Sequence, residues 1–157
     1  MPRKASLSSS PSFVADSMLG DVARWLRLLG FDCLYNSSLH DDQLLEIAWS
    51  QCRVLLTRDK DLHRRALARG AVSILVNSTD ITQALKQISE ELQILLLFDE
   101  RRSRCPSCNA PLKMVSREEV ADKVPEGILS RYFKFWVCTN PECGKVYWIG
   151  SHWRTIR

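Results

Sequence analysis

Short apolar runs alternate with longer amphipathic segments over the first two thirds of the chain. Each run has the length and the apolar content of a buried strand, and each longer segment repeats its apolar residues at the spacing of a helix face. The predicted strands are residues 12–16, 31–35, 53–57 and 71–77, and the predicted helices are residues 21–30, 41–51, 60–70 and 80–98. This alternation predicts βαβ units and a parallel sheet covered on both faces, which is a Rossmann-type three-layer α/β domain over residues 13–98.

Two glycines mark helix ends in this pattern. Gly30 and Gly70 each follow the last apolar position of a predicted helix. Glycine is the usual residue at the end of a helix because it adopts the left-handed conformation without steric cost. Both helices are therefore expected to end at these residues.

The pattern changes near residue 99. A charged linker, "DERRSR", is followed by four cysteines, with prolines among and between them. Between the cysteine pairs, residues 116–124 are predicted to be helical and residues 128–138 to form a strand. The segment 99–157 is too short and too polar for a large core, so a bound metal would have to stabilise it. Residues 1–12 are rich in serine and proline and are expected to be a flexible tail.

Composition limits the class of protein. The chain has 157 residues, of which 45% are apolar, and this supports a folded core. There is no apolar run of the roughly 18 residues that a membrane span needs, and the N-terminus lacks the apolar region of a signal peptide. We therefore expect a soluble, cytoplasmic protein without a membrane partner. The formal net charge is +4, and all of the excess lies in residues 99–157, where eleven basic residues face seven acidic ones. This bias is compatible with a polyanionic partner.

The six cysteines are of two kinds. Cys33 and Cys52 are isolated in apolar surroundings. The other four form two close pairs separated by 29 residues, and they are Cys105, Cys108, Cys138 and Cys143. Four thiolates can hold a structural Zn²⁺ in tetrahedral geometry, and such a closed shell stabilises a fold rather than catalysing a reaction. Free thiols or disulfides are the alternative.

Acidic residues gather at the predicted carboxyl ends of the strands. Asp16 ends the first strand, Asp59 and Asp61 follow the third, and Asp41 and Asp42 open the second helix. Ligands of open parallel sheets bind at this edge, and carboxylates crowded there repel one another unless a hard cation such as Mg²⁺ or Mn²⁺ joins them. The alternative is that Asp41 and Asp59 simply cap helices, while Asp61 and Glu46 are ordinary solvated carboxylates.

Several of these stretches together resemble one family. "VADSMLGDVARWLRLLGFD", "DDQLLEIA", "RVLLTRDKDL", "CPSCNAPL" and "VYWIGSHWRTI", in this order, are similar to the Mut7-C RNase family. The resemblance covers nearly everything after the N-terminal tail. It implies a PIN-like nuclease domain followed by a small zinc ribbon, and a hydrolase that cleaves RNA as a metal-dependent endoribonuclease.

The resemblance also implies roles for individual residues. The acidic site that binds Mg²⁺ or Mn²⁺ would consist of Asp16, Asp42, Asp59 and Asp61, with Glu46 as the alternative to Asp42. The same pairing of PIN-like domain and zinc ribbon occurs in a ribosomal RNA processing nuclease, which makes structured or ribosomal RNA a candidate partner. PIN-like domains often dimerise, so a homodimer is compatible with the resemblance.

Basic and aromatic residues are the candidate RNA contacts. Arg24, Arg27 and Arg58 lie near the acidic positions, where the alternative role is a surface salt bridge. Near the C-terminus, aromatics could stack bases while cations hold phosphates. The candidates there are Lys145, His152, Trp153 and Arg154; Trp136, Tyr147 and Trp148 could instead form the small core of the ribbon. A non-catalytic RNA-binding or adaptor protein and a toxin-like nuclease with an antitoxin partner are the rival functions.

Overall fold

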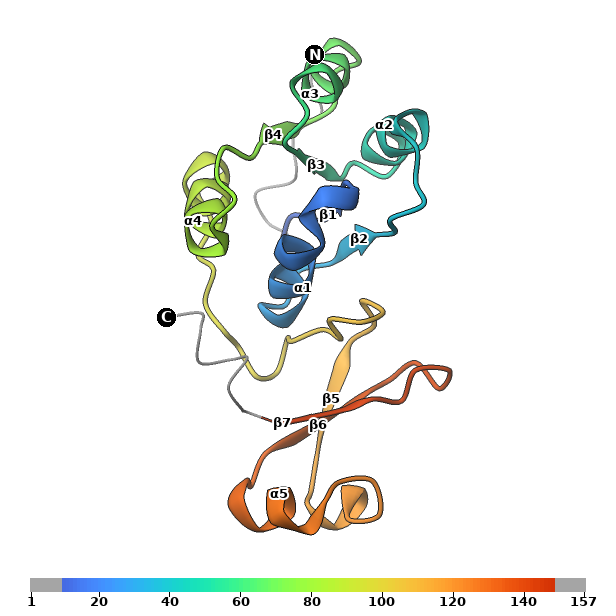
Figure 1. Cartoon of the computed structure of the whole chain (residues 1–157), viewed down its shortest axis with the longest axis vertical. Coiled ribbons are helices and arrows are strands. Elements are labelled where there is room, and N and C mark those ends of the chain that lie inside the picture. Colours follow the sequence, from blue (N-terminus) through green and yellow to red (C-terminus); the bar gives the residue numbers. More distant parts are fainter. Residues whose placement is uncertain (1–9, 149–157) are drawn as a thin grey trace.

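A four-stranded parallel sheet forms the first part of the molecule (Figure 1). The computed structural model describes residues 10–148. The strand order is β2-β1-β3-β4, so β1 lies in the interior between β2 and β3. The prediction of an α/β fold with a parallel sheet is confirmed. The strands are β1 (Phe13–Ala15), β2 (Cys33–Tyr35), β3 (Val54–Thr57) and β4 (Ser73–Leu75).

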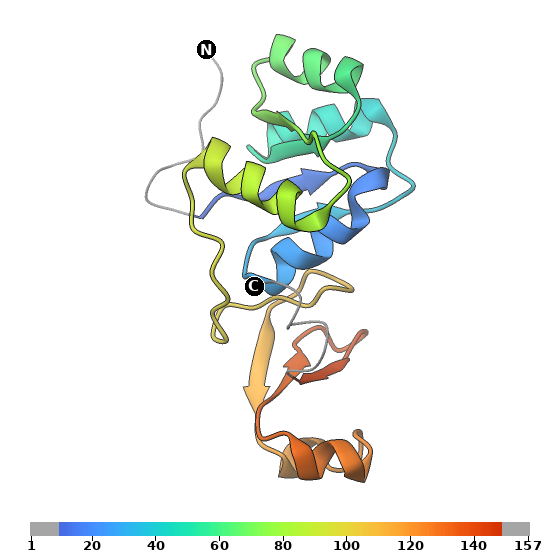
Figure 2. The ribbon, with the colours of Figure 1, turned by 60° about the vertical axis from the view of Figure 1, so that its left-hand side comes forward.

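Helices cover both faces of this sheet (Figure 2). On one face, α1 (Gly20–Leu28) and α4 (Ile81–Leu92) pack against Phe13 and Ala15. On the other face, α2 (Asp41–Ser50) and α3 (Lys60–Ala68) pack against Val14. Neighbouring residues of β1 thus serve opposite cores, as the two-residue period of a strand requires. All three are fully buried, and burying a Phe or Val side chain contributes about 1.5–3 kcal/mol.

The glycine positions agree with the predicted helix ends. Gly30 has φ 98° and Gly70 has φ 83°, the left-handed region that favours glycine. Gly30 also allows a close approach, because a Cβ atom there would lie 3.0 Å from the backbone oxygen of Arg102. This position therefore brings the later part of the chain against the end of α1.

The helix predicted over residues 80–98 is shorter than expected. It ends at Leu92 because Gln93 takes a left-handed conformation with φ 54°. Residues 94–98 belong to no helix or strand, with Ile94 and Leu96 packed on the core and Leu95 and Leu97 exposed. The run "ILLLF" therefore follows a strand-like two-residue period.

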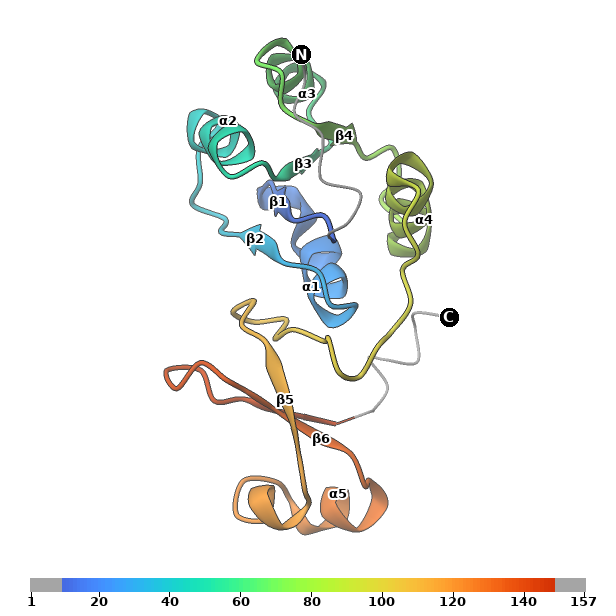
Figure 3. The ribbon, with the colours of Figure 1, turned by 180° about the vertical axis from the view of Figure 1, so that it is seen from behind.

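A second, antiparallel sheet follows, in the order β5-β6-β7. Figure 3 shows the segment after α4 passing beside α1 before it enters β5. The strands are β5 (Leu112–Val115), β6 (Phe135–Cys138) and β7 (Val146–Trp148).

The segment between the cysteine pairs differs from the prediction. Residues 116–124 contain only the 3₁₀ turn η2 (Glu118–Val120) rather than a helix. The strand predicted over residues 128–138 is divided between α5 (Glu126–Arg131) and β6. Pro125 has φ −57° at the start of α5, and proline is suited to the start of a helix but not to its interior. The helix ends where Tyr132 becomes extended.

The first described residues of the chain pack against the parallel sheet. Residues 1–9 of the predicted tail lie outside the described residues, whereas Pro11 is buried and the carbonyl of Ser12 accepts a hydrogen bond of 2.8 Å from the Val54 N–H. Among residues 10–148, none of the helices has the length and apolar character needed to cross a bilayer.

Candidate functional site

The carboxyl ends of β1 and β3 lie next to each other in the sheet. From β1 the chain first goes to β2 on one side and then returns through α2 to β3 on the other side. This reversal of strand order is the place where open α/β sheets bind ligands. Asp16 follows β1 directly, and Thr57 is the last residue of β3.

Hydrogen bonds connect Asp16 to Asp59 through Thr57. The buried Thr57 hydroxyl donates to Oδ2 of Asp16, and its oxygen accepts from the Asp59 N–H at 3.0 Å. Oδ1 of Asp16 accepts from the Met18 N–H at 3.0 Å, at the start of the 3₁₀ turn η1 (Ser17–Leu19). Asp16 itself is only 8% exposed. The sequence interpretation did not include Thr57 among the site residues, although a hydroxyl ending a buried strand beside an acidic turn was an available signal.

Asp59 caps α3, as the structural alternative anticipated. Its Oδ1 accepts hydrogen bonds from the N–H groups of Asp61 at 2.9 Å and Leu62 at 3.2 Å. Among residues 10–148, its Oδ2 has no hydrogen-bond partner. Capping therefore uses one oxygen of this exposed carboxylate and leaves the other available for a ligand.

The acidic residues of α2 pair with arginines in α3 and at its C-terminal cap. Oδ1 of Asp42 lies 2.8 Å from Nη2 of Arg65, and Oε2 of Glu46 lies 3.0 Å from Nη2 of the cap residue Arg69. Asp61 forms an ion pair with Arg64 on its own helix. The N-cap of α2 is His40, so Asp41 is the first helical residue and not the cap.

The structure thus links Asp16 through Thr57 to the backbone N–H of Asp59 and gives Asp42 and Asp61 arginine partners. In the part of the chain that the structure describes, the acids do not form a group of three ligands. The four-carboxylate site stays a prediction.

The three predicted arginine contacts have different surroundings. Arg24 is exposed and pairs with Asp21. Arg58 lies beside the acidic turn, where Nη2 donates to the Ser78 carbonyl at 3.0 Å and its buried Nε has no hydrogen-bond partner among residues 10–148. It lines a cavity of about 120 Å³ together with residues of η1 and α1.

Arg27 departs from the expected RNA contact because it is buried. Its Nε donates to the Cys33 carbonyl at 2.9 Å, and its Nη1 donates to the Pro106 carbonyl at 2.8 Å. Burial lowers the pKa of Arg27, while the nearby thiols Cys33, Cys105 and Cys108 act in the opposite direction. The role of Arg27 in the structure is to connect α1 to β2 and to the first cysteine pair.

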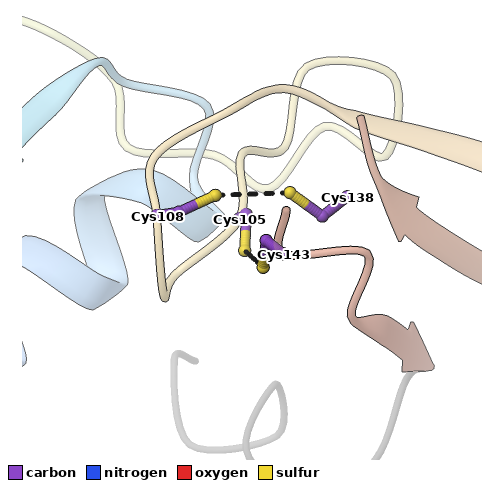
Figure 4. A group of neighbouring side chains, drawn as sticks. All are labelled: Cys105, Cys108, Cys138 and Cys143. Carbon is purple, nitrogen blue, oxygen red and sulfur yellow. Dashed lines mark hydrogen bonds between the residues drawn. The ribbon is translucent and has the colours of Figure 1, made fainter. Parts of the chain in front are cut away.

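The register of the second sheet brings the two cysteine pairs together. Leu112 at the start of β5 lies opposite Cys138 at the end of β6. The turn before β5 carries Cys105 and Cys108, and the turn after β6 carries Cys143. Figure 4 shows the four side chains pointing toward one another.

The geometry of the thiols fits a tetrahedral metal. All four sulfur atoms lie within 4.8 Å of one another, with 3.3 Å between Cys108 and Cys138 and 3.8 Å between Cys105 and Cys143. Zinc bound at about 2.3 Å by four sulfurs places them about 3.8 Å apart. None of the four cysteines forms a disulfide. These residues could bind a metal such as zinc.

The thiols differ in their readiness to ionise. Although burial acts against it, hydrogen bonds from the Ala110 backbone and from the other thiols lower the pKa of Cys108 to about 7. Burial raises the pKa of Cys138 to about 12. A metal that takes all four thiolates must therefore displace protons, and its affinity falls as the pH falls.

Comparison with known families identifies this arrangement of sheet and cysteines. The model of the Mut7-C RNAse domain matches residues 11–157. The chain belongs to the Mut7-C RNAse domain family. Neither the curated proteins nor the solved structures gave a significant match. Membership indicates a nuclease-related function that involves RNA, and the predicted resemblance is confirmed.

A polar contact joins the two sheets of the Mut7-C chain. Asn109, directly after Cys108, donates to Oδ1 of Asp32 at 2.7 Å and accepts from the Cys33 N–H at 3.1 Å. Arg53 binds the same carboxylate with both terminal nitrogens, at 2.9 and 3.2 Å. Although burial raises it, the hydrogen bonds from Arg53 and Asn109 lower the pKa of Asp32 overall. The first cysteine pair is therefore fastened to the loop that leads into β2.

The C-terminal candidates of the Mut7-C chain divide into described and undescribed residues. Lys145 is exposed and donates to the Ser107 hydroxyl at 2.9 Å. Trp136 is fully buried, Tyr147 packs beside the cysteines and Trp148 contacts the neighbouring cluster, which agrees with the predicted core role. His152, Trp153 and Arg154 lie outside the described residues.

Proposed function

We propose that this chain is a PIN-like endoribonuclease that hydrolyses RNA phosphodiester bonds with Mg²⁺ or Mn²⁺ at the carboxyl edge of its parallel sheet. One observation supports this most strongly. Asp16 and Asp59 are connected through Thr57 at the point where the strand order reverses, in a chain of an RNAse domain family. Oxygen ligands at such an edge suit a hard divalent cation.

The proposed ligands are Asp16, Asp42, Asp59 and Asp61. Asp16 is held by its hydrogen bonds with Thr57 and Met18, so it would present a fixed carboxylate. Asp42 and Asp61 are exposed and paired with arginines, and such surface pairs contribute only about 0–1 kcal/mol. Their side chains can therefore turn toward a cation at little cost.

The cation, when bound, supplies charge neutralisation at the phosphate and a more acidic water molecule. The protein supplies position. Arg58 would bind a phosphate of the RNA beside Asp59, and Arg24 would contact the sugar–phosphate backbone of the same RNA chain. Burial of Asp16 reduces competition from water for its carboxylate oxygens.

The second part of the proposal concerns residues 99–157 as a zinc ribbon. Structural zinc at the four cysteines would stabilise this module, which would help to hold RNA through Lys145, His152, Trp153 and Arg154. The parallel-sheet domain over residues 13–98 would carry the chemistry.

One observation favours a rival function. The ion pairs of Asp42 and Asp61 leave two carboxylates outside the Asp16 site, as expected of an RNA-binding protein without catalysis.

RNA cleavage by Asp59→Asn separates these functions. Asparagine caps a helix as well as aspartate does, so this change removes a charged ligand and keeps α3 intact. With Mn²⁺, we expect Asp59→Asn and Asp16→Asn to lose cleavage by about 10²-fold or more, because metal-assisted reactions lose several kcal/mol with a ligand. Glu90→Gln, an exposed change in the last turn of α4, is the matched control.

Two results would contradict the proposal. One is cleavage by Asp59→Asn at the wild-type rate with an unchanged metal requirement. The other is RNA binding by the wild type without cleavage in either Mg²⁺ or Mn²⁺, which is the result that the rival function predicts.

A further inference from the structure

Phe133 is an exposed aromatic residue on a basic loop. It lies between α5 and β6, and its exposed fraction is 75%. The guanidinium of Arg117 lies over its ring, 5.3 Å from the centroid. Arg131 and Lys134 flank it in the sequence and are exposed. Residues 131–134 line a cavity of about 300 Å³.

The loop rests on a packed base. Val120, Val124 and Phe135 are buried in one cluster, and Tyr132 packs against it. The Tyr132 N–H donates to the Ile128 carbonyl at 3.1 Å. The ring of Phe133 is thus presented by a segment whose neighbour Tyr132 packs on a buried cluster, and such ordering before binding reduces the entropy lost on binding.

The surroundings of Phe133 favour a charged, planar partner. Leu95 and Leu97 are exposed to a similar degree but have no basic residue beside them in the sequence. Around Phe133, in contrast, Arg117 lies over the ring and Arg131 and Lys134 flank it in the sequence, although Nζ of Lys134 also forms an ion pair of 2.9 Å with Glu100. Proteins that bind single-stranded nucleic acid combine these two elements, because aromatic rings stack on bases while Lys and Arg hold phosphates.

We propose that Phe133, with Arg117, Arg131 and Lys134, forms a stacking site for a base of single-stranded RNA. This inference rests on the proposed function and names a substrate contact outside the acidic edge. Figures 1 and 2 show α5 at the far end of the second sheet from the parallel sheet. An RNA strand that occupies both sites would extend from the parallel sheet past the second sheet to α5.

Binding of single-stranded RNA tests the site. The probe is a fluorescein-labelled oligouridylate of 12 nucleotides, measured by fluorescence anisotropy in an Asp59→Asn background that prevents cleavage. We expect Phe133→Ala to weaken binding about tenfold, the loss of one stacked base. Phe133→Tyr keeps the ring and should bind like the parent, whereas Phe133→Leu should resemble Phe133→Ala. Leu97→Ala is the control for loss of exposed apolar surface.

Charge is tested separately. Arg131→Met should lower the slope of log affinity against log salt by about 0.7, the value for one phosphate contact on a single strand. Unchanged melting temperature and zinc content confirm that the variants are folded.

The results separate this site from the proposed function. Equal affinity of Phe133→Ala and the parent overturns the stacking site, while loss of cleavage in Asp59→Asn still supports the nuclease. Equal binding by Phe133→Leu and Phe133→Tyr also overturns it, because apolar contact would then suffice. A change of oligomeric state in Phe133→Ala, seen by sedimentation, overturns it in favour of a second copy of the chain. Absence of RNA binding by every variant contradicts both proposals.

Discussion

The cysteine cluster and the acidic edge are both candidate metal centres, yet they are assembled differently. The four thiols come from two tight turns that one strand register holds together, and their sulfurs already lie within 4.8 Å. The acids come from two strand ends and two helix starts, and Asp16 is linked through Thr57 to the backbone N–H of Asp59 rather than to its carboxylate. The fold alone therefore brings the four thiols together, whereas the acidic residues would come together only when a cation binds.

Hydrogen bonding accounts for this difference. Thiols are weak hydrogen-bond donors and acceptors. The four cysteine side chains therefore lose little when a metal replaces their existing hydrogen bonds. Carboxylates are strong acceptors, and those of the acidic edge are already used by backbone N–H groups, a hydroxyl and arginines. Apart from Oδ2 of Asp59, the carboxylate oxygens of Asp16, Asp42 and Asp61 that form these bonds would therefore have to exchange them for the cation.

The largest expected effect is at the cysteine cluster. Cys138→Ser should reduce the zinc content from about one ion per chain to near zero and unfold the second sheet, since binding of structural zinc contributes about 10 kcal/mol or more to such modules. Metal analysis reports the first effect, and the tryptophan fluorescence, to which the buried Trp136 contributes along with four other tryptophans, reports the second. Cys52→Ser, an exposed cysteine outside the cluster, is the control. Retention of both zinc and native fluorescence by Cys138→Ser would show that the cluster is not an integral part of the fold.

An intermediate effect is expected where the two sheets meet. Asn109 has φ 74°, so Asn109→Gly keeps the backbone conformation and removes only the side-chain bonds to Asp32 and Cys33. The Cys33 N–H is then left without its acceptor, while Asp32 keeps its hydrogen bonds to Arg53, so the change should cost about 2 kcal/mol of unfolding free energy, measured by chemical denaturation. Hydrogen exchange should increase in β2 as well as in the cysteine turn. Loss of protection in the turn alone would mean that the two sheets are independent.

The matched control for that experiment is Asn36→Ala. The side chain of Asn36 makes one exposed hydrogen bond, of 2.9 Å, to the Ser38 N–H. Its removal should cost only about 0.5 kcal/mol.

The smallest effect on stability is expected at the acidic edge. Asp42→Asn removes an exposed ion pair with Arg65 and should change the unfolding free energy by less than about 1 kcal/mol without metal. Binding of Mn²⁺ should raise the melting temperature of the wild type, and it should raise that of Asp42→Asn by less. Glu46→Gln, tested in parallel, examines the alternative ligand. Equal gains for the wild type and Asp42→Asn would remove Asp42 from the proposed site.

Much of the first sheet could be predicted because its signals are local. Apolar runs of four or five residues with glycines at helix ends determine strands and helices by short-range rules. The helix predicted beyond Leu92 was wrong because consecutive apolar residues fit a helix and a strand equally well. The conformation of this segment depends on contacts of Ile94 and Leu96 with a distant core.

The candidate sites show the same limit. Cysteine spacing predicts a cluster because both turns are short, and the structure brings the four thiols together. The roles of Thr57, Arg27 and Asn109 depend on partners 41 to 79 residues away in the sequence. Pairs of this kind have no periodic signature, so an arginine on a helix could be assigned to RNA when its partner is a backbone carbonyl.

The bond between Asn109 and Cys33 has a consequence for the timing of synthesis. The two residues are 76 positions apart, so the Cys33 N–H is made long before its acceptor. At about 5–20 residues per second, a ribosome needs about 4–15 s to add the intervening chain. During this interval the parallel sheet lacks the side chain of Asn109, which accepts a hydrogen bond from the first residue of β2. The hydrogen bonds from the last third of the polypeptide therefore form only after all four strands of the parallel sheet have been synthesised.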